Sequence, residues 1–285
     1  MTDDTVVADP PPPAVPPDKA PMSTGDKVRF VLRGIGQTLI TLGLVVLLFV
    51  VYEVWITNIF AHRAQDKVHT ALEKEWATGQ DPLLALPGSK DPTIPLGSGI
   101  ANIYVPRLGR DFHFTIVQGS IVPTDAELEK GPAHYRGTAL PGQVGNFSIA
   151  GHRVGKGEPF LNLDQLRSGD AVIIETRSTW FVYRVKGTPA GADPQTAKLD
   201  ADGIPGREIV DPAAGRVLLP VPNHPDTPAT ERLLTMTTCH PKFTATQRMI
   251  VHAVLADKVA VPVSGGKRAS AMPASISALY TEVKA

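Results

Sequence analysis

A run of nineteen residues without a charged side chain, from Gly34 to Tyr52, constrains this chain more than any other feature. A helix of that length rises about 28 Å, which roughly matches the ~30 Å hydrocarbon core of a bilayer. Tyr52 and Trp55 stand at one end of the run, where amphipathic aromatic residues favour the membrane interface. The run therefore predicts a transmembrane anchor over residues 34–56.

The charges around this run indicate its orientation. Lys27, Arg29 and Arg33 precede it, which favours a cytoplasmic N-terminus, although basic residues also follow it. One alternative is a cleaved signal peptide. The apolar region of such a peptide is normally about 7–15 residues long, and no small-x-small cleavage site follows this segment. A buried helix of a soluble protein is another alternative. We expect a single-pass protein of the cell membrane with its body outside the cell.

The segments on either side of the anchor differ in composition. Residues 1–33 contain the proline-dominated tract DPPPPAVPPDKAP and predict a disordered cytoplasmic tail. Residues 57–98 begin with helix formers, among which Val68, Leu72 and Trp76 repeat at four-residue spacing, and they continue as a Pro/Gly-rich segment. They predict a helical stalk followed by a linker.

The body, residues 99–259, consists of short β-type runs separated by turns. The clearest hairpin runs from Ala171 to Gly187 around a turn at residues 176–178. Strands this short favour a closed barrel or sandwich over a parallel α/β sheet. The other expected strands are Ala101–Gly109, Phe112–Gly119, Asn146–His152, Arg216–Val221, Arg232–Cys239 and Gln247–Ala256.

The end of the chain, residues 260–285, is expected to be a flexible tail. Its Gly- and Ser-rich start supports that expectation. The alternative is a short docked helix, because apolar residues recur at helical spacing: Met272, Ile276, Leu279, Tyr280 and Val283.

The chain contains a single cysteine, Cys239. Exported proteins normally use cysteines in pairs, as disulfides, so this thiol cannot form a structural bridge within the chain. It is either a buried apolar side chain or a nucleophile. Cys239 and His240 together offer too few ligands for a zinc site, so we expect neither a metal nor another cofactor.

An arginine follows the cysteine at a spacing that suits a hairpin. Every second residue of Arg232–Cys239 faces one side of a strand, and Pro241 ends the ladder because it has no N–H to donate. If the next strand pairs back, Cys239 and Arg248 both lie at the mouth of the hairpin and point the same way. A guanidinium there stabilises negative charge on sulfur and on an oxyanion formed during attack on a carbonyl.

A thiol nucleophile also needs a proton-transfer partner, and eight histidines are available. His152 follows an apolar run and Gly151, just before a glycine-containing loop, where its ring can project over a cleft. The others fit less well: His62 and His69 lie in the predicted stalk, His113 and His252 in mid-strand, His134 and His224 in loops expected to be exposed, and His240 on the opposite strand face from Cys239. For His252 we expect a satisfied core histidine.

The segment GNFSIAGHR, the later TTCHP stretch and Arg248 together resemble the sortases, which are cysteine transpeptidases on the outer face of Gram-positive membranes. The likeness runs from about Ile100 to Asp257. The strand end reads TMTTC where the family usually has Thr-Leu-x-Thr-Cys. The Cys-His-Pro ending and GPAHYRGTALPGQVGNFSIAGHR look most like the class E branch of actinobacteria. The resemblance implies an all-β fold, a closed eight-stranded barrel with short helical turns.

The resemblance also implies a chemistry. It assigns the nucleophile to Cys239, the paired histidine to His152 and the oxyanion-stabilising arginine to Arg248. The thiolate attacks the Thr carbonyl of a C-terminal sorting signal, of the Leu-Ala-x-Thr-Gly type in class E relatives, and an amine then resolves the thioester. Tyr135 is a candidate contact for the alanine of the signal and Thr238 for the groove floor, with ordinary packing as the alternative for each.

The implied partners are secreted proteins that bear the sorting signal, and lipid II or another peptidoglycan stem-peptide amine as acceptor. A pilin-polymerising sortase would use a lysine of another subunit instead. An exported cysteine protease or an L,D-transpeptidase shares the acyl-enzyme chemistry, whereas a non-enzymatic wall-binding module would keep Cys239 in its core. The formal net charge of +0 gives no argument for a nucleic-acid partner.

Overall fold

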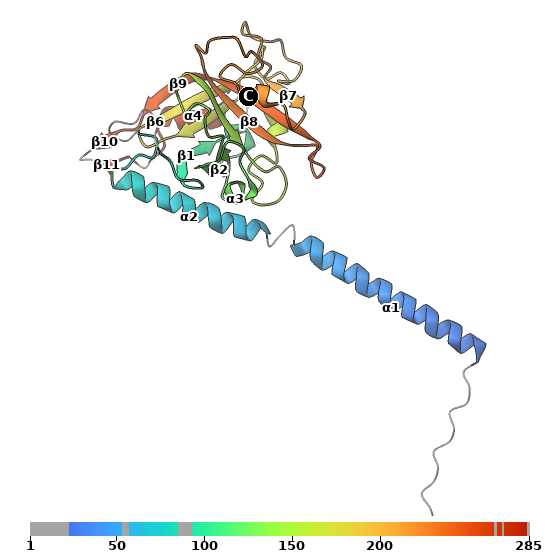
Figure 1. Ribbon diagram of the computed structural model, residues 1–285. Coiled ribbons are helices and arrows are strands. Elements are labelled where there is room, and N and C mark those ends of the chain that lie inside the picture. The colour runs from blue at the N-terminus through green and yellow to red at the C-terminus, as the bar shows by residue number, and fades with distance from the viewer. Residues whose placement is uncertain (1–22, 53–56, 85–92, 265–266, 270, 284–285) are drawn as a thin grey trace, which may run out of the picture. The chain divides into compact units, whose positions relative to one another are not determined.

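The computed structural model describes residues 23–52, 57–84, 93–264, 267–269 and 271–283 (Figure 1). Most of the predicted tail 1–33 lies outside these ranges, as do Trp55 and the middle of the predicted linker. The chain divides into two compact units, residues 1–50 and 51–285.

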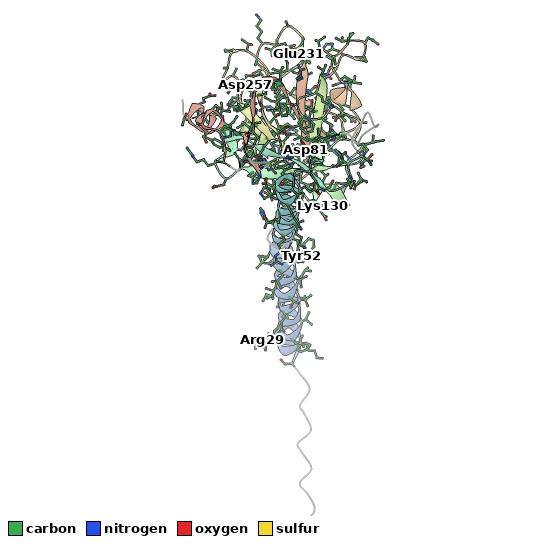
Figure 2. All side chains as sticks on the ribbon, turned by 90° about the vertical axis from the view of Figure 1, so that its left-hand side faces the viewer. Arg29, Tyr52, Asp81, Lys130, Glu231 and Asp257 are labelled. Carbon is green, nitrogen blue, oxygen red and sulfur yellow. The ribbon has the colours of Figure 1, made fainter. Side chains whose placement is uncertain are left out.

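The first unit contains the helix α1 (Thr24–Val51). It begins ten residues before the predicted start at Gly34, because the residues ahead of the apolar run include good helix formers and no proline. Among the described residues it is the one helix that is long and apolar enough to cross a membrane, because Lys27–Val51 contains an 18-residue stretch with a mean hydropathy of 2.3. Figure 2 shows its side chains pointing outward around the helix axis between the labelled Arg29 and Tyr52.

The second unit contains a closed β-barrel, as predicted. Its strands follow the order β6-β5-β1-β2-β3-β4-β8-β9, and pairing of β9 with β6 closes the ring. A further strand, β7 (Arg207–Val210), pairs with β9 and was not predicted. The eight barrel strands are β1 (Gly99–Tyr104), β2 (His113–Gln118), β3 (Ala133–His134), β4 (Gly145–Ala150), β5 (Ala171–Glu175), β6 (Thr179–Val185), β8 (Arg232–His240) and β9 (Gln247–Ala260).

The barrel core follows the alternation of its strands. Leu234 and Met236 of β8 pack inside the barrel with Met249 and Val251 of β9. Because successive strand side chains point to opposite faces, the alternate residues of β8, Thr235, Thr237 and Cys239, belong to the outer face. The alternation expected for β8 therefore places the cysteine outside the core.

Helix α2 (Thr57–Ala77) lies where the sequence predicted a helical stalk, and it docks on the barrel. Leu72 and Trp76 are buried, and α2 lies against β1 and β2 (Figure 1). Gly99 permits the close approach, since a Cβ there would lie 3.1 Å from Leu72 Cβ. His69 Nδ1 also forms a hydrogen bond of 3.1 Å with Thr115 Oγ1. The four-residue apolar repeat thus marks a face that docks on the barrel.

Short elements lie between and after the barrel strands, and one of them replaces an expected strand. The segment predicted as the strand Arg216–Val221 contains the 3-10 helix η4 (Gly215–Leu218). Its last carbonyls are bound by a side chain and not by a strand, because Asn146 Nδ2 donates to the carbonyls of Val217 and Leu219. The remaining elements are η2 (Pro106–Leu108), α3 (Asp125–Leu128), η3 (Leu163–Gln165), β10 (Val263–Ser264) and β11 (Lys267–Arg268).

The C-terminal region also differs from the flexible tail that was expected. Helix α4 (Ala274–Glu282) buries Ile276 and Leu279 against Trp180 and Val182 of β6. The helical spacing of its apolar residues therefore corresponds to a docked helix, the alternative that the sequence left open.

Candidate active site

Three adjacent strands bring His152, Cys239 and Arg248 to the same end of the barrel. Ala150 of β4 lies beside Thr237 of β8, which lies opposite Ile250 of β9. Two residues further along the hairpin, Cys239 lies opposite Arg248. His152 comes two residues after Ala150, as Cys239 comes two residues after Thr237. The register of β4, β8 and β9 thus sets these three residues in a row.

The row opens onto a cavity of about 480 Å³. All five residues singled out in the sequence line it: Tyr135, His152, Thr238, Cys239 and Arg248. A wall that the sequence did not predict comes from the end of β7 and the chain through η4, residues 210–215, 217 and 218, where Val210 and Val217 pack with Ile250. Asp125 of α3 also lines the cavity, beside the histidine.

Cys239 is a free thiol and is partly exposed to solvent. This exposure contradicts the interpretation as a buried apolar cysteine. The backbone behind the thiol is held from the interior, because Arg153 Nη1 donates to the Cys239 carbonyl at 3.3 Å. The same nitrogen donates to His240 Nδ1 at 2.8 Å, so His240 points away from the cysteine, as its strand position predicts.

The backbone at His152 is fixed on both sides. The Gly151 N–H donates to the Thr237 carbonyl at 3.0 Å, and the Phe160 N–H donates to the His152 carbonyl at 3.0 Å. A Cβ on Gly151 would lie 2.5 Å from the Phe160 ring, so only glycine fits between the strand end and that ring. These contacts hold the imidazole over the cavity.

The His152 side chain is only 16% exposed, and its Nε2 has no hydrogen-bond partner within the described part of the chain. Asp125 Oδ1 lies 3.8 Å from Nε2. Burial lowers the pKa of His152, and the charge of Lys156 lowers it further, against the opposite influence of Asp125 and Glu129. Neutral imidazole is therefore favoured at neutral pH.

Arg248 is anchored at the turn between β8 and β9. Its Nη1 donates to the carbonyls of Ala245 at 2.9 Å and Gln247 at 3.0 Å. Arginine carries five N–H donors, so these two bonds hold one corner of the guanidinium while further donors remain on Nε and Nη2. The guanidinium is thereby held at the cavity mouth.

Tyr135 contacts β8 from outside the strand, and Thr238 belongs to the strand itself. The Tyr135 hydroxyl shares a hydrogen bond of 2.8 Å with Thr237 Oγ1, and burial raises the pKa of Tyr135. Thr238 is buried, and its hydroxyl donates to the Gly151 carbonyl at 2.8 Å. Thr238 therefore supports the backbone that carries His152, in addition to lining the cavity.

Two other histidines can be compared with expectation. His134 was expected to be exposed in a loop, but it is 2% exposed in β3, where Nε2 pairs with the Ala139 carbonyl at 3.1 Å. Burial lowers its pKa to about 4. His252 is the satisfied core histidine expected, with partners in Thr235 and Glu208.

Three neighbours of the site were missed from the sequence: Asp125, Arg153 and Thr237. A local signal existed only for Asp125, because Thr124 and Glu127 form a capping box that predicts a helix start. Arg153 and Thr237 act through partners more than eighty residues away, so no local pattern identifies them.

Comparisons with known proteins agree with one another. A family model described as "Sortase domain" matches residues 103–256. The chain is similar to Sortase SrtE1 of Streptomyces coelicolor, with 36% identity over 54% of this chain and 42% of the relative, and to Sortase SrtE2 of the same organism, with 34% identity over 60% and 66%. The chain thus spans less than half the length of SrtE1 and about two thirds of SrtE2.

A solved structure supports the same likeness. The SrtF sortase from Corynebacterium diphtheriae superposes with a TM-score of 0.55 and 37% identity. The match covers 68% of this chain and 98% of that one.

Proposed function

The chain belongs to the sortase family, with class E relatives, and from this premise we propose that it is a transpeptidase that uses Cys239, His152 and Arg248. Members of this family are cysteine transpeptidases. The proposed substrate is a secreted protein with a C-terminal sorting signal, and the proposed reaction transfers that protein to an amine.

In the first half of the reaction, His152 accepts the proton of the Cys239 thiol, and Cys239 Sγ attacks the carbonyl carbon of the Thr–Gly bond. The carbonyl oxygen becomes an oxyanion, which the Arg248 guanidinium stabilises by charge and hydrogen bonding. As the tetrahedral intermediate collapses, protonated His152 donates its proton to the leaving glycine nitrogen. A thioester remains on Cys239, and the glycine end departs as an amine.

In the second half, an acceptor amine attacks the thioester carbonyl. Neutral His152 accepts the proton that the amine loses, and Cys239 leaves as a thiolate. Since burial favours neutral imidazole, His152 is suited to this role as a base. A new amide bond forms, His152 returns its proton to Cys239, and the enzyme is back in its starting state.

The observation that carries this proposal is the row of His152, Cys239 and Arg248 along one cavity. Strand register sets the positions of Cys239 and Arg248, and the loop directly after β4 places His152 beside them. The partial exposure of the thiol adds support, because a nucleophile must reach its substrate.

We infer that the signal is of the Leu-Ala-x-Thr-Gly type, with Tyr135 against its alanine. Tyr135 lines the cavity beside Cys239, and its hydroxyl is oriented by Thr237. The proposed acceptor is an amine of a peptidoglycan stem peptide, such as that of lipid II. Helix α1 is proposed as the single membrane span, with a cytoplasmic N-terminus and the barrel outside.

The test uses the full-length chain in detergent with a Leu-Ala-x-Thr-Gly peptide and a stem-peptide amine. We expect the ligated product, read by mass spectrometry, and no product with Cys239→Ala. Predominant hydrolysis at saturating amine would assign the site to a protease-like enzyme instead. Faster transfer to a lysine-bearing pilin peptide than to the stem amine would assign it to pilus assembly.

A further inference from the structure

A carboxylate lies beside the histidine in the wall of the cavity. Asp125 is the first residue of α3, and a capping box holds the start of that helix: Glu127 Oε2 accepts from the Thr124 N–H at 2.7 Å and pairs with the Thr124 hydroxyl. The helix start therefore presents Asp125 from a fixed backbone position.

The two oxygens of Asp125 have different neighbours. Oδ1 lies 3.8 Å from His152 Nε2, which is beyond hydrogen-bond length but close enough for a charge interaction. Oδ2 accepts from Lys156 Nζ at 2.9 Å, and Lys156 also bonds Glu129 Oε1 at 2.9 Å. The lysine thus connects the loop after β4, which carries His152 and Lys156, to α3. It also partly neutralises the carboxylate beside the imidazole.

The charged and titratable groups around His152 come from four parts of the chain. Asp125 and Glu129 approach from α3 and the residue after it, Lys156 from the histidine's own loop, and Cys239 and Arg248 from β8 and β9. Arg153 is directed elsewhere, to Asp164 and His240. Only Asp125 among these offers a carboxylate oxygen within 4 Å of the buried, unpartnered Nε2.

We propose that Asp125 is a positioning residue for His152: it orients the imidazole and stabilises its protonated form during acyl transfer, and Lys156 limits that effect. This inference rests on the proton-transfer role proposed for His152. The carboxylate is 70% exposed, so solvent screens it and its influence is moderate. An oxygen that shifts by about 1 Å as substrate excludes water would form a direct hydrogen bond.

The simplest alternative is that Asp125 only anchors α3 to the loop through Lys156. The two roles differ in what Glu129 does, because Glu129 shares the anchor but not the approach to His152. Glu129→Gln is therefore the matched control for Asp125→Asn. Lys156→Gln removes a positive charge, so we expect it to shift the pKa of His152 in the direction opposite to Asp125→Asn.

The direct test is a histidine NMR titration of the full-length chain in detergent, with the His152 signal assigned by its loss in His152→Gln. We expect Asp125→Asn to lower the pKa of His152, Lys156→Gln to raise it and Glu129→Gln to change it less than Asp125→Asn. An unchanged pKa in Asp125→Asn, or an equal shift in Glu129→Gln, would overturn the proposal. This readout requires no transpeptidation, so it stands apart from failure of the proposed function.

The kinetic test measures kcat/KM against pH for peptide transfer. In Asp125→Asn we expect the part of the pH profile that reports the titration of His152 to move to lower pH. We also expect kcat/KM at neutral pH to fall about three- to tenfold. Asp125→Glu should recover part of that loss, and Glu129→Gln should keep the wild-type profile. If kcat/KM of Asp125→Asn fell equally at every pH, and Asp125→Glu did not restore it, Asp125 would only anchor α3 to the loop after β4.

Discussion

Cys239 and Arg248 are direct cross-strand partners in the β8–β9 hairpin and lie on its outer face at the end where the turn begins. Side chains at such paired positions start about 4.5–5.5 Å apart at Cβ. The ladder between the two strands therefore keeps sulfur and guanidinium together without a contribution from a loop. A register slip of one residue would turn one of them into the barrel.

Replacing Arg248 by lysine tests whether the shape of the guanidinium matters. Lysine keeps the charge but loses the planar fork of donors, so we expect kcat/KM to fall about 100- to 1000-fold with the fold intact. Steady-state kinetics and circular dichroism provide the measurement. Arg232→Lys, at the other end of β8, is the matched control, and a near-normal rate for Arg248→Lys would remove its oxyanion role.

The hydrogen bond between Tyr135 and Thr237 predicts that their substitutions are not additive. Tyr135→Phe and Thr237→Val each remove one partner of the same 2.8 Å bond. We expect each to weaken peptide turnover by about 1 kcal/mol in transition-state free energy, and the double variant to lose little more than either one. Additive losses in kcat/KM would show that the two side chains act independently.

Gly151→Ala should disturb the histidine through the Phe160 ring. The added Cβ would lie 2.5 Å from a ring carbon, so the ring or the strand end must move. We expect the free energy of unfolding to fall by about 1–3 kcal/mol, measured in urea. Gly215→Ala is the control for stability, because nothing lies within 4 Å of its Cβ position. Equal stability of the two variants would contradict the predicted clash.

The acid stability of the barrel should depend on Glu208. Burial pushes the pKa of this carboxyl up, but hydrogen bonds from His252 and Asn223 outweigh burial and lower it from 4.5 to about 2. A lowered folded-state pKa gives stability that is present above pH 4.5 and lost as the pH falls through about 2. Glu208→Gln should therefore flatten the decline of unfolding free energy across this window. A parallel decline in both proteins would refute the assignment.

Local patterns predicted the strands that form the site. The alternation of Arg232–Cys239 and the Cys239 to Arg248 spacing anticipated the β8–β9 hairpin, because strand periodicity is a property of adjacent residues. The docking of the stalk helix was missed for a different reason. The spacing of Val68, Leu72 and Trp76 identifies an apolar face but not the surface that covers it.

Contacts between distant segments were beyond such patterns. The approach of Asp125 to His152 depends on how α3 and the loop after β4 fold over the barrel end. His134 looked like a loop residue, yet pairing of β3 with β2 and β4 buries it. In each case tertiary packing, and not local preference, determined the environment of the side chain.

The central claim is that Cys239 forms the acyl-enzyme, and trapping that species tests it most directly. The full-length chain is mixed with a Leu-Ala-x-Thr-Gly peptide, quenched in acid and analysed by peptide mass mapping. We predict one hydroxylamine-sensitive acyl adduct on Cys239, which is absent in Cys239→Ala and forms more slowly in His152→Ala. Folded protein that turns the peptide over without an adduct on Cys239, or that acylates another residue, would contradict the account.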